Sequence, residues 1–140
     1  MDIRQERDWS RNMIIGIGTD IVKIDRFVHV NEQFLARVYT QQEQAYIQAK
    51  NHATAAGLFA AKEAVAKALG TGFNGFWPCD IEVTHNDKGH PAVLLHNKAE
   101  AVAMQLAAAA GNDRHSINLS ISHSDSDAVA FAIIEALTQK

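Results

Sequence analysis

The sequence predicts an α+β fold in which an antiparallel sheet has helices packed on one side. Two observations carry this prediction. The expected elements occur in the order β-α-α-α-β-β-α-β-β, and strong turn signals join neighbouring strands into hairpins, which pair antiparallel. The length of 140 residues fits one domain, which we place at 13–140 behind an N-terminal extension of residues 1–12.

The first expected element is a buried strand over residues 13–20 (MIIGIGTD). Strand alternation divides its side chains between two faces, with Ile15 and Ile17 on one and Ile14, Gly16, Gly18 and Asp20 on the other. The two glycines leave room for the close approach of another backbone or of a ligand. Asp20 stands where this strand ends.

Helices are expected next. Residues 21–30 place apolar side chains at helical spacing, with Lys23 and Arg26 on the wetter side. Thr40 and Glu43 then form a T-x-x-E capping box, which opens a second helix that runs to about residue 49.

A third helix begins at Asn51 or Thr54 and runs to Leu69, before a glycine that favours a helix stop. It is rich in strong helix formers. The rest of the chain reads as two hairpins with an Ala-rich helix between them. In chain order these elements are a hairpin over 79–95, a helix over 97–111 and a hairpin over 117–134.

Composition excludes several classes of protein. The net charge of −3 and the pI of about 6.1 give no basic surplus, so nucleic acid is not an expected partner. No run of about 18 apolar residues could span a membrane, and the charged N-terminus lacks the apolar segment of a signal peptide. The single cysteine, Cys79, permits no intrachain disulfide and is interpreted as a buried or neutral thiol. We therefore expect a cytoplasmic protein.

Glu63 and Lys67 lie four residues apart on the third helix and so share one face. As an exposed ion pair they would contribute only about 0.3–0.5 kcal/mol. Their neighbours are Phe59 and alanines, and a carboxylate and an amine on such a face indicate a partner or a ligand. Asp20 is a candidate partner, because two carboxylates from different elements can hold Mg²⁺ together with substrate phosphates. A lysine beside such a metal would neutralise phosphate charge.

His123 belongs to a third polar cluster, SISHS, at the end of a predicted strand. It is either a phosphate-binding residue or a turn residue with local hydrogen bonds. A Ser–His nucleophile is not expected, since adjacent residues on a strand point apart. The other histidines lack the spacing of zinc ligands, and the chain has neither a dinucleotide fingerprint nor a P-loop.

Four segments together resemble the holo-acyl-carrier-protein synthase family of 4′-phosphopantetheinyl transferases. They are GIGTDIVKIDRF (16–27), FAAKEAVAKALGTG (59–72), CDIEVTHNDKGHPAV (79–93) and SISHSDSDAVAFAI (120–133). Their order and spacing match as well, so the resemblance covers nearly all of the chain after residue 12. It implies the fold of these transferases and the transfer of 4′-phosphopantetheine from coenzyme A to a serine of apo acyl carrier protein. The reaction would release 3′,5′-ADP and support fatty acid biosynthesis.

The resemblance also implies roles for single residues. Asp20 and Glu63 would bind Mg²⁺ with phosphate oxygens of coenzyme A. Glu63, or a water that it orients, would take the serine proton. Lys67 would contact the phosphates and assist the departing nucleotide.

Further residues would hold the two substrates. Lys62 and His123 would help to bind coenzyme A, and Arg26 resembles the family's basic site for the acidic carrier protein. Members of this short type are commonly homotrimers with sites between subunits, so a homotrimer is the expected assembly. Leu58 departs from the pattern, because many members have Arg there, a cation that could hold a substrate phosphate.

Three alternatives to the transferase stay open. The first is a coenzyme A or nucleotide binder without turnover, which Leu58 makes conceivable. The second is a Mg²⁺-dependent pyrophosphate hydrolase that uses the same carboxylates with water as the nucleophile. The third is an oligomeric scaffold in which Glu63 and Lys67 form only an ion pair.

Overall fold

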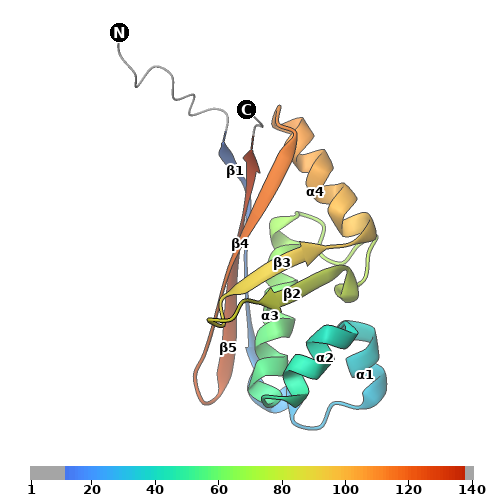
Figure 1. The fold of residues 1–140 in the computed structure, drawn as a ribbon, viewed down its shortest axis with the longest axis vertical. Helices are drawn as coiled ribbons and strands as arrows, with labels where there is room; N and C mark the ends of the chain where they lie inside the picture. Colours follow the sequence, from blue (N-terminus) through green and yellow to red (C-terminus); the bar gives the residue numbers. More distant parts are fainter. Residues whose placement is uncertain (1–11, 138–140) are drawn as a thin grey trace.

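Two antiparallel sheets and four α-helices make up residues 12–137, the part of the chain that the computed structural model describes. Three long strands form one sheet in the order β1-β5-β4: β1 (Met13–Lys23), β5 (Asp127–Leu137) and β4 (Arg114–His123). A separate hairpin pairs β2 (Ile81–His85) with β3 (Pro91–Leu95). Figure 1 shows the helices and this hairpin on one side of the three-stranded sheet. The predicted fold class is therefore confirmed.

Side-chain caps fix where the first three of the four α-helices begin. The helices are α1 (Glu32–Val38), α2 (Gln41–Gln48), α3 (His52–Ala68) and α4 (Asn97–Ala109), with short 3₁₀ helices η2 (Ile24–Phe27) and η3 (Pro78–Asp80). The predicted capping box is present, since Thr40 Oγ1 accepts from Glu43 N at 3.2 Å and Glu43 Oε1 accepts from Thr40 N at 2.8 Å. Asn51 caps α3 by accepting from Thr54 N at 3.1 Å. Within the described residues, no helix combines the length and the apolar character that crossing a membrane requires.

Residues 21–30 do not form the predicted helix. β1 continues to Lys23 because its ladder with β5 continues, and η2 follows. The apolar spacing has another origin: a strand that runs into one 3₁₀ turn also buries Val22, Ile24 and Phe27. Most of the extension predicted for residues 1–12 lies outside the described residues, so that boundary stays a prediction.

The two faces of the three-stranded sheet differ in side-chain size. Toward α3, β5 presents five fully buried side chains, which are Ala128, Ala130, Ala132, Ile134 and Ala136. The opposite face carries large apolar side chains that stay exposed, with Ile17 and Ile21 each 66% exposed and Phe131 54% exposed. The prediction that the first strand is buried is therefore wrong for this face.

A β-bulge corrects the predicted division of the first strand. The register with β5 shifts between Ile14 and Gly16, so that Ile15 is the extra residue and the alternation slips by one. As a result Ile14 lies on the exposed side, while Ile15 packs against the core.

Gly16 and Gly18 let α3 lie directly on β1. A Cβ added to Gly18 would be 1.8 Å from the carbonyl oxygen of Ala64, and one added to Gly16 would be 2.0 Å from that of Ala68. The glycines indicated the close approach of a backbone or of a ligand to this strand, and the structure shows that the backbone of α3 occupies the space. This contact places the C-terminal part of α3 beside the middle of β1, two residues before Asp20, and the strand continues beyond Asp20 to Lys23.

Candidate functional site

Asp20 and Lys67 meet where α3 crosses β1. Lys67 Nζ donates to Asp20 Oδ1 at 3.1 Å and to the carbonyl oxygen of Thr19 at 3.0 Å. The Asp20 side chain is 16% exposed and that of Lys67 is 52% exposed, so the pair lies at the surface with its carboxylate partly covered. The amine is thus accessible to a ligand.

Glu63 shares this surface with Asp20. Partial burial raises the pKa of Glu63 above its usual range, and the negative charge of Asp20 raises it further. The cations Lys67 and Arg26 act in the opposite direction and lower that pKa without cancelling the rise. The structure therefore brings together four charged residues that the sequence analysis singled out on three separate segments.

Two neighbouring carboxylates are a donor set for a hard cation. The described residues hold no group of three or more His, Cys, Asp or Glu that could bind a metal by themselves. Mg²⁺, however, is commonly held by one or two carboxylates, with phosphate oxygens and waters as its other ligands. Burial and the neighbouring charge of Asp20 both oppose the ionisation of Glu63, and a divalent cation bound between the two carboxylates would favour it. The residues present therefore fit a metal that binds jointly with a phosphate-bearing substrate.

Arg26 lies on η2 at the rim of this cluster and is exposed. Its guanidinium carbon is 6.0 Å from the centre of the Phe27 ring, whose own side chain is buried in the core. The charged group of the arginine thus lies near a ring of the core, while the residue stays exposed to solvent. A partner with acidic residues could contact it beside Glu63.

His123 lies apart from the carboxylates, at the end of β4. In the three-stranded sheet β5 separates β4 from β1, so His123 and Asp20 are on outer strands of one chain. The exposed ring has Nδ1 3.1 Å from the carbonyl oxygen of Ser124, which agrees with the local contact considered for it. A single chain therefore does not bring His123 to the metal-binding candidates.

A pocket of about 170 Å³ lies next to His123. Its wall includes Tyr46 and His85, whose rings stack in parallel with their centres 4.0 Å apart. Leu58, which stands where many family members have Arg, also lines it. The departure from the family pattern thus falls in a pocket, where it replaces a possible cation by an apolar wall.

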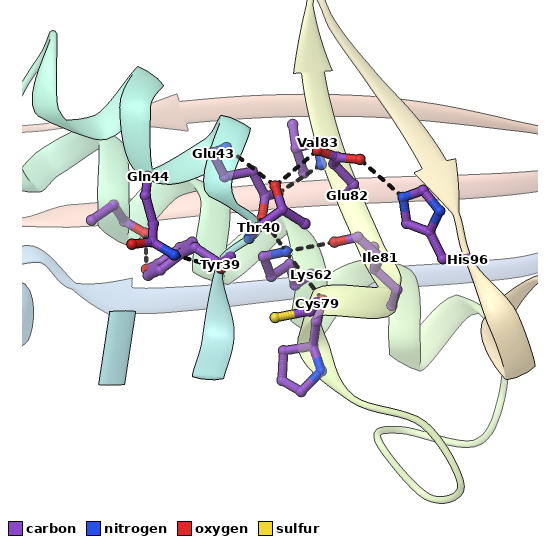
Figure 2. A network of polar contacts seen from close by, with 12 residues as sticks. Tyr39, Thr40, Glu43, Gln44, Lys62, Cys79, Ile81, Glu82, Val83 and His96 are labelled. Carbon is purple, nitrogen blue, oxygen red and sulfur yellow. Dashed lines mark hydrogen bonds and ion pairs between the residues drawn. The ribbon is translucent and has the colours of Figure 1, made fainter. Parts of the chain in front are cut away.

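Lys62 does not face the cluster of Asp20 and Glu63. Its side chain is buried, and Nζ donates to Glu43 Oε1 at 2.7 Å, to the Pro78 carbonyl at 3.1 Å and to the Ile81 carbonyl at 2.5 Å (Figure 2). These contacts occupy all three donors of an ammonium group. The predicted role of Lys62 in holding coenzyme A therefore finds no free donor in this structure.

Sequence reasoning missed the polar network around Lys62. Glu43, the partner of Lys62, also donates its backbone N–H to Thr40 Oγ1. Thr40 Oγ1 in turn donates to Glu82 Oε2 at 2.8 Å, and Glu82 Oε1 lies 2.9 Å from His96 Nε2 (Figure 2). One signal was available: Glu82 stands between two apolar strand residues, and Lys62 stands among alanines that proved to be buried. Which acid meets which base depends on contacts far apart in the sequence.

Cys79 agrees with the interpretation as a neutral thiol. Its Sγ donates to the Arg37 carbonyl at 3.1 Å. Burial is the main cause that raises the pKa of this thiol, so the protonated form prevails at neutral pH.

Comparison with known proteins assigns this arrangement to a family. A family model described as the 4′-phosphopantetheinyl transferase superfamily matches residues 16–132. The holo-[acyl-carrier-protein] synthase of Clostridium perfringens strain 13 is 44% identical over 128 residues, which cover 88% of this chain and 95% of that protein. The holo-[acyl-carrier-protein] synthase of Caldicellulosiruptor saccharolyticus is 47% identical over 127 residues, or 88% of this chain and 98% of that protein.

Solved structures that are similar to this chain are also holo-acyl-carrier-protein synthases. The crystal structure of a holo-(acyl-carrier-protein) synthase from Bacillus anthracis in complex with CoA (3′,5′-ADP) has a TM-score of 0.71 and 33% identity. The match covers 89% of this chain and 98% of that one. The Helicobacter pylori holo-[acyl-carrier-protein] synthase in complex with coenzyme A has a TM-score of 0.70 and 29% identity, with 84% and 98% of the two chains covered.

Proposed function

The chain belongs to the 4′-phosphopantetheinyl transferase superfamily and moves phosphopantetheine from coenzyme A to apo acyl carrier protein, and we propose that this transfer takes place at Asp20, Glu63 and Lys67. One observation carries this assignment: the packing of α3 on β1 gathers two carboxylates and an amine from distant segments onto one partly covered surface. Such a surface matches a pyrophosphate bound through a metal ion.

Asp20 and Glu63 would hold Mg²⁺, whose remaining ligands would be waters and phosphate oxygens of coenzyme A. When bound, the ion neutralises the pyrophosphate and makes its phosphorus a better electrophile. The fit of the two carboxylates to a hard cation supports this part of the proposal.

Glu63 and Lys67 contribute the chemistry that belongs to the chain itself. Glu63, directly or through a water that it orients, accepts the proton of the carrier serine, for which a raised pKa is suitable. The serine oxygen then forms its bond to phosphorus while the bond from that phosphorus to the bridging pyrophosphate oxygen breaks. Lys67 stabilises the negative charge that grows on the departing 3′,5′-ADP.

Arg26 provides the contact for the carrier protein. It is exposed and close enough to Glu63 to lower the pKa of that carboxyl, so an acidic carrier bound at Arg26 would present its serine near the cluster. Charge complementarity of this kind speeds association and selects partners.

The assembly that we propose is a homotrimer. Its support is the exposed apolar face of the sheet formed by Ile17, Ile21 and Phe131, which no helix within residues 12–137 covers. A site completed by a neighbouring subunit would also give His123 a role in holding coenzyme A, although within one chain β5 separates its strand from that of Asp20. We place the reaction in the cytoplasm, in support of fatty acid biosynthesis.

The test is intact-mass spectrometry of an apo acyl carrier protein after incubation with the enzyme, coenzyme A and Mg²⁺, beside a parallel reaction in EDTA. We expect a gain of one phosphopantetheine that EDTA abolishes. Asp20→Ala and Glu63→Ala should abolish the gain, whereas Glu100→Ala, an exposed carboxylate on α4, should not. Full activity in both site variants would refute the assignment.

Two other outcomes would favour the alternatives. Release of phosphopantetheine without any carrier would indicate a pyrophosphate hydrolase. Binding of coenzyme A without product, with several carriers tried, would indicate a binder without turnover, and Leu58→Arg would then be the first change to make.

A further inference from the structure

Lys62 and Glu63 are consecutive on α3, yet one side chain is buried and the other lies at the active cluster. We propose that the buried pair of Lys62 and Glu43 is a positioning device: it fixes the rotation of α3 about its own axis and thereby aims Glu63 and Lys67 at Asp20. The inference rests on the proposed function, since it assigns a purpose to the support of that same cluster.

The pair ties α3 to segments on the side away from β1. Lys62 Nζ reaches α2 through Glu43, η3 through the Pro78 carbonyl and the start of β2 through the Ile81 carbonyl (Figure 2). Glu43 is equally committed, since Oε1 also accepts from Thr40 N at 2.8 Å and Oε2 accepts from Val83 N at 2.7 Å. Acceptors fixed in this way allow only one placement of the ammonium group.

Packing alone does not explain why an ion pair occupies this position. The two side chains are 1% and 0% exposed, and well-packed apolar residues could often fill such a volume without the cost of removing charges from water. What the ion pair adds is direction, because a hydrogen bond fails when its angle changes, whereas an apolar contact tolerates sliding.

The sequence of α3 makes such direction necessary. Its buried surface consists largely of alanines, namely Ala55, Ala56, Ala60, Ala61, Ala64, Ala66 and Ala68. Short side chains interlock little. The backbone contact at Gly18 fixes how close the helix lies to β1, but a smooth surface leaves its rotation weakly determined.

Small rotations matter at the active cluster. A side-chain tip lies roughly 5–6 Å from the helix axis, so a turn of about 10° displaces it by about 1 Å. A misplacement of about 1 Å can cost catalysis about 100-fold. Holding Lys62 therefore holds Glu63, its neighbour, and Lys67, which lies farther along the same helix.

The experiment measures the metal site apart from turnover. Mn²⁺ binding to the full chain is titrated by electron paramagnetic resonance with saturating coenzyme A and no carrier. Lys62→Met should weaken Mn²⁺ binding about 10–100-fold, the usual effect of losing an outer support of metal ligands. Tyr39→Phe is the matched control, because it removes an equally buried hydrogen bond to α3, from Tyr39 Oη to the Ala55 carbonyl at 2.7 Å, without touching the lysine's acceptors.

The control separates positioning from stability. We expect both variants to unfold at a lower temperature than the wild type, but only Lys62→Met to bind Mn²⁺ more weakly and to have a lower kcat. If both melt early and both bind Mn²⁺ like the wild type, the pair is merely structural and the inference is overturned. Should Lys62→Met not fold, Glu43→Gln takes its place, with a smaller loss of affinity expected and an unchanged affinity again counting against the inference.

Asp20→Ala keeps this inference separate from the proposed function. If Asp20→Ala binds Mn²⁺ as the wild type does, the proposed metal site is itself wrong. If Asp20→Ala loses the metal while Lys62→Met keeps it, only the positioning role fails.

Discussion

Replacing Gly18 with alanine should push α3 off β1 and damage both stability and transfer. The new Cβ would lie 1.8 Å from the carbonyl oxygen of Ala64 and 2.8 Å from the backbone nitrogen of Ala68, and backbone atoms cannot rotate away. Ordinary contact begins at 3.4 Å, so the helix must retreat by about 1.6 Å. Overpacking typically costs 1–3 kcal/mol, and against backbone we expect about 3 kcal/mol, or roughly 10 °C in melting temperature.

Two assays test this expectation. Thermal unfolding followed by circular dichroism at one protein concentration gives the loss of stability. Transfer measured by intact mass at a temperature where the variant is folded gives the second effect. Because Glu63 precedes Ala64, a shift above 1 Å should lower kcat by about 100-fold.

Gly57 offers a matched control on α3 itself. A Cβ there would meet only the Ile121 side chain, at 3.1 Å, which can turn aside. Alanine also favours a helix interior by about 1 kcal/mol over glycine, so Gly57→Ala should melt at or above the wild-type temperature. Wild-type melting and transfer in Gly18→Ala would show that α3 does not lie on β1 as described, and the reasoning would be refuted.

Three further changes test the charges and the exposed face. Glu63→Gln should abolish transfer yet raise the melting temperature in EDTA at pH 7. Burial and Asp20 raise the pKa of Glu63 in the folded state, so the ionised carboxyl costs stability once the pH has risen through that pKa. The gain in melting temperature should vanish near pH 4, where the carboxyl is protonated in both the folded and the unfolded state. Equal melting at pH 7 would contradict this. Ile21→Glu should lower the particle mass in light scattering, because it puts a charge on the exposed apolar face of the sheet. Met104→Glu, which puts the same charge on an exposed apolar residue of α4, should not. An unchanged mass for Ile21→Glu would rule out assembly through the sheet face. Arg26→Glu should raise the KM for the carrier while coenzyme A binding, followed by titration calorimetry, stays unchanged, and equal weakening of both substrates would remove the carrier assignment.

Local chemistry explains what the sequence could predict. The starts of α2 and α3 follow from single side chains, Thr40 and Asn51, that satisfy backbone donors within one turn. For these caps the deciding atoms lie within a few residues. The meeting of Asp20 with Glu63 and Lys67 is a different case, because 47 residues separate Asp20 from Lys67. The strand glycines and the charged face of the helix each indicated a close partner, and it was the resemblance to a family that joined the two segments in one site.

Features that depend on distant partners were predicted wrongly or missed. The apolar spacing after Asp20 fits a helix as well as a strand that runs into a 3₁₀ turn, and only pairing with β5 decides between them. Ile14 changed sides because of a bulge that the sequence does not signal. The sequence did not reveal the buried position of Lys62, because its acceptors, Glu43 and the carbonyl of Ile81, come together only in the folded chain. Lys62 was therefore expected at the ligand.

The contact between α3 and β1 also limits how the length of this chain can change. A single residue inserted within α3 would turn everything after it by about 100°. The buried lysine, the carboxylate beside Asp20 and the alanines over the glycines would then all face the wrong way at once. Insertions and deletions among relatives should therefore fall before Asn51 or after Gly70, and the helix between them should keep one length.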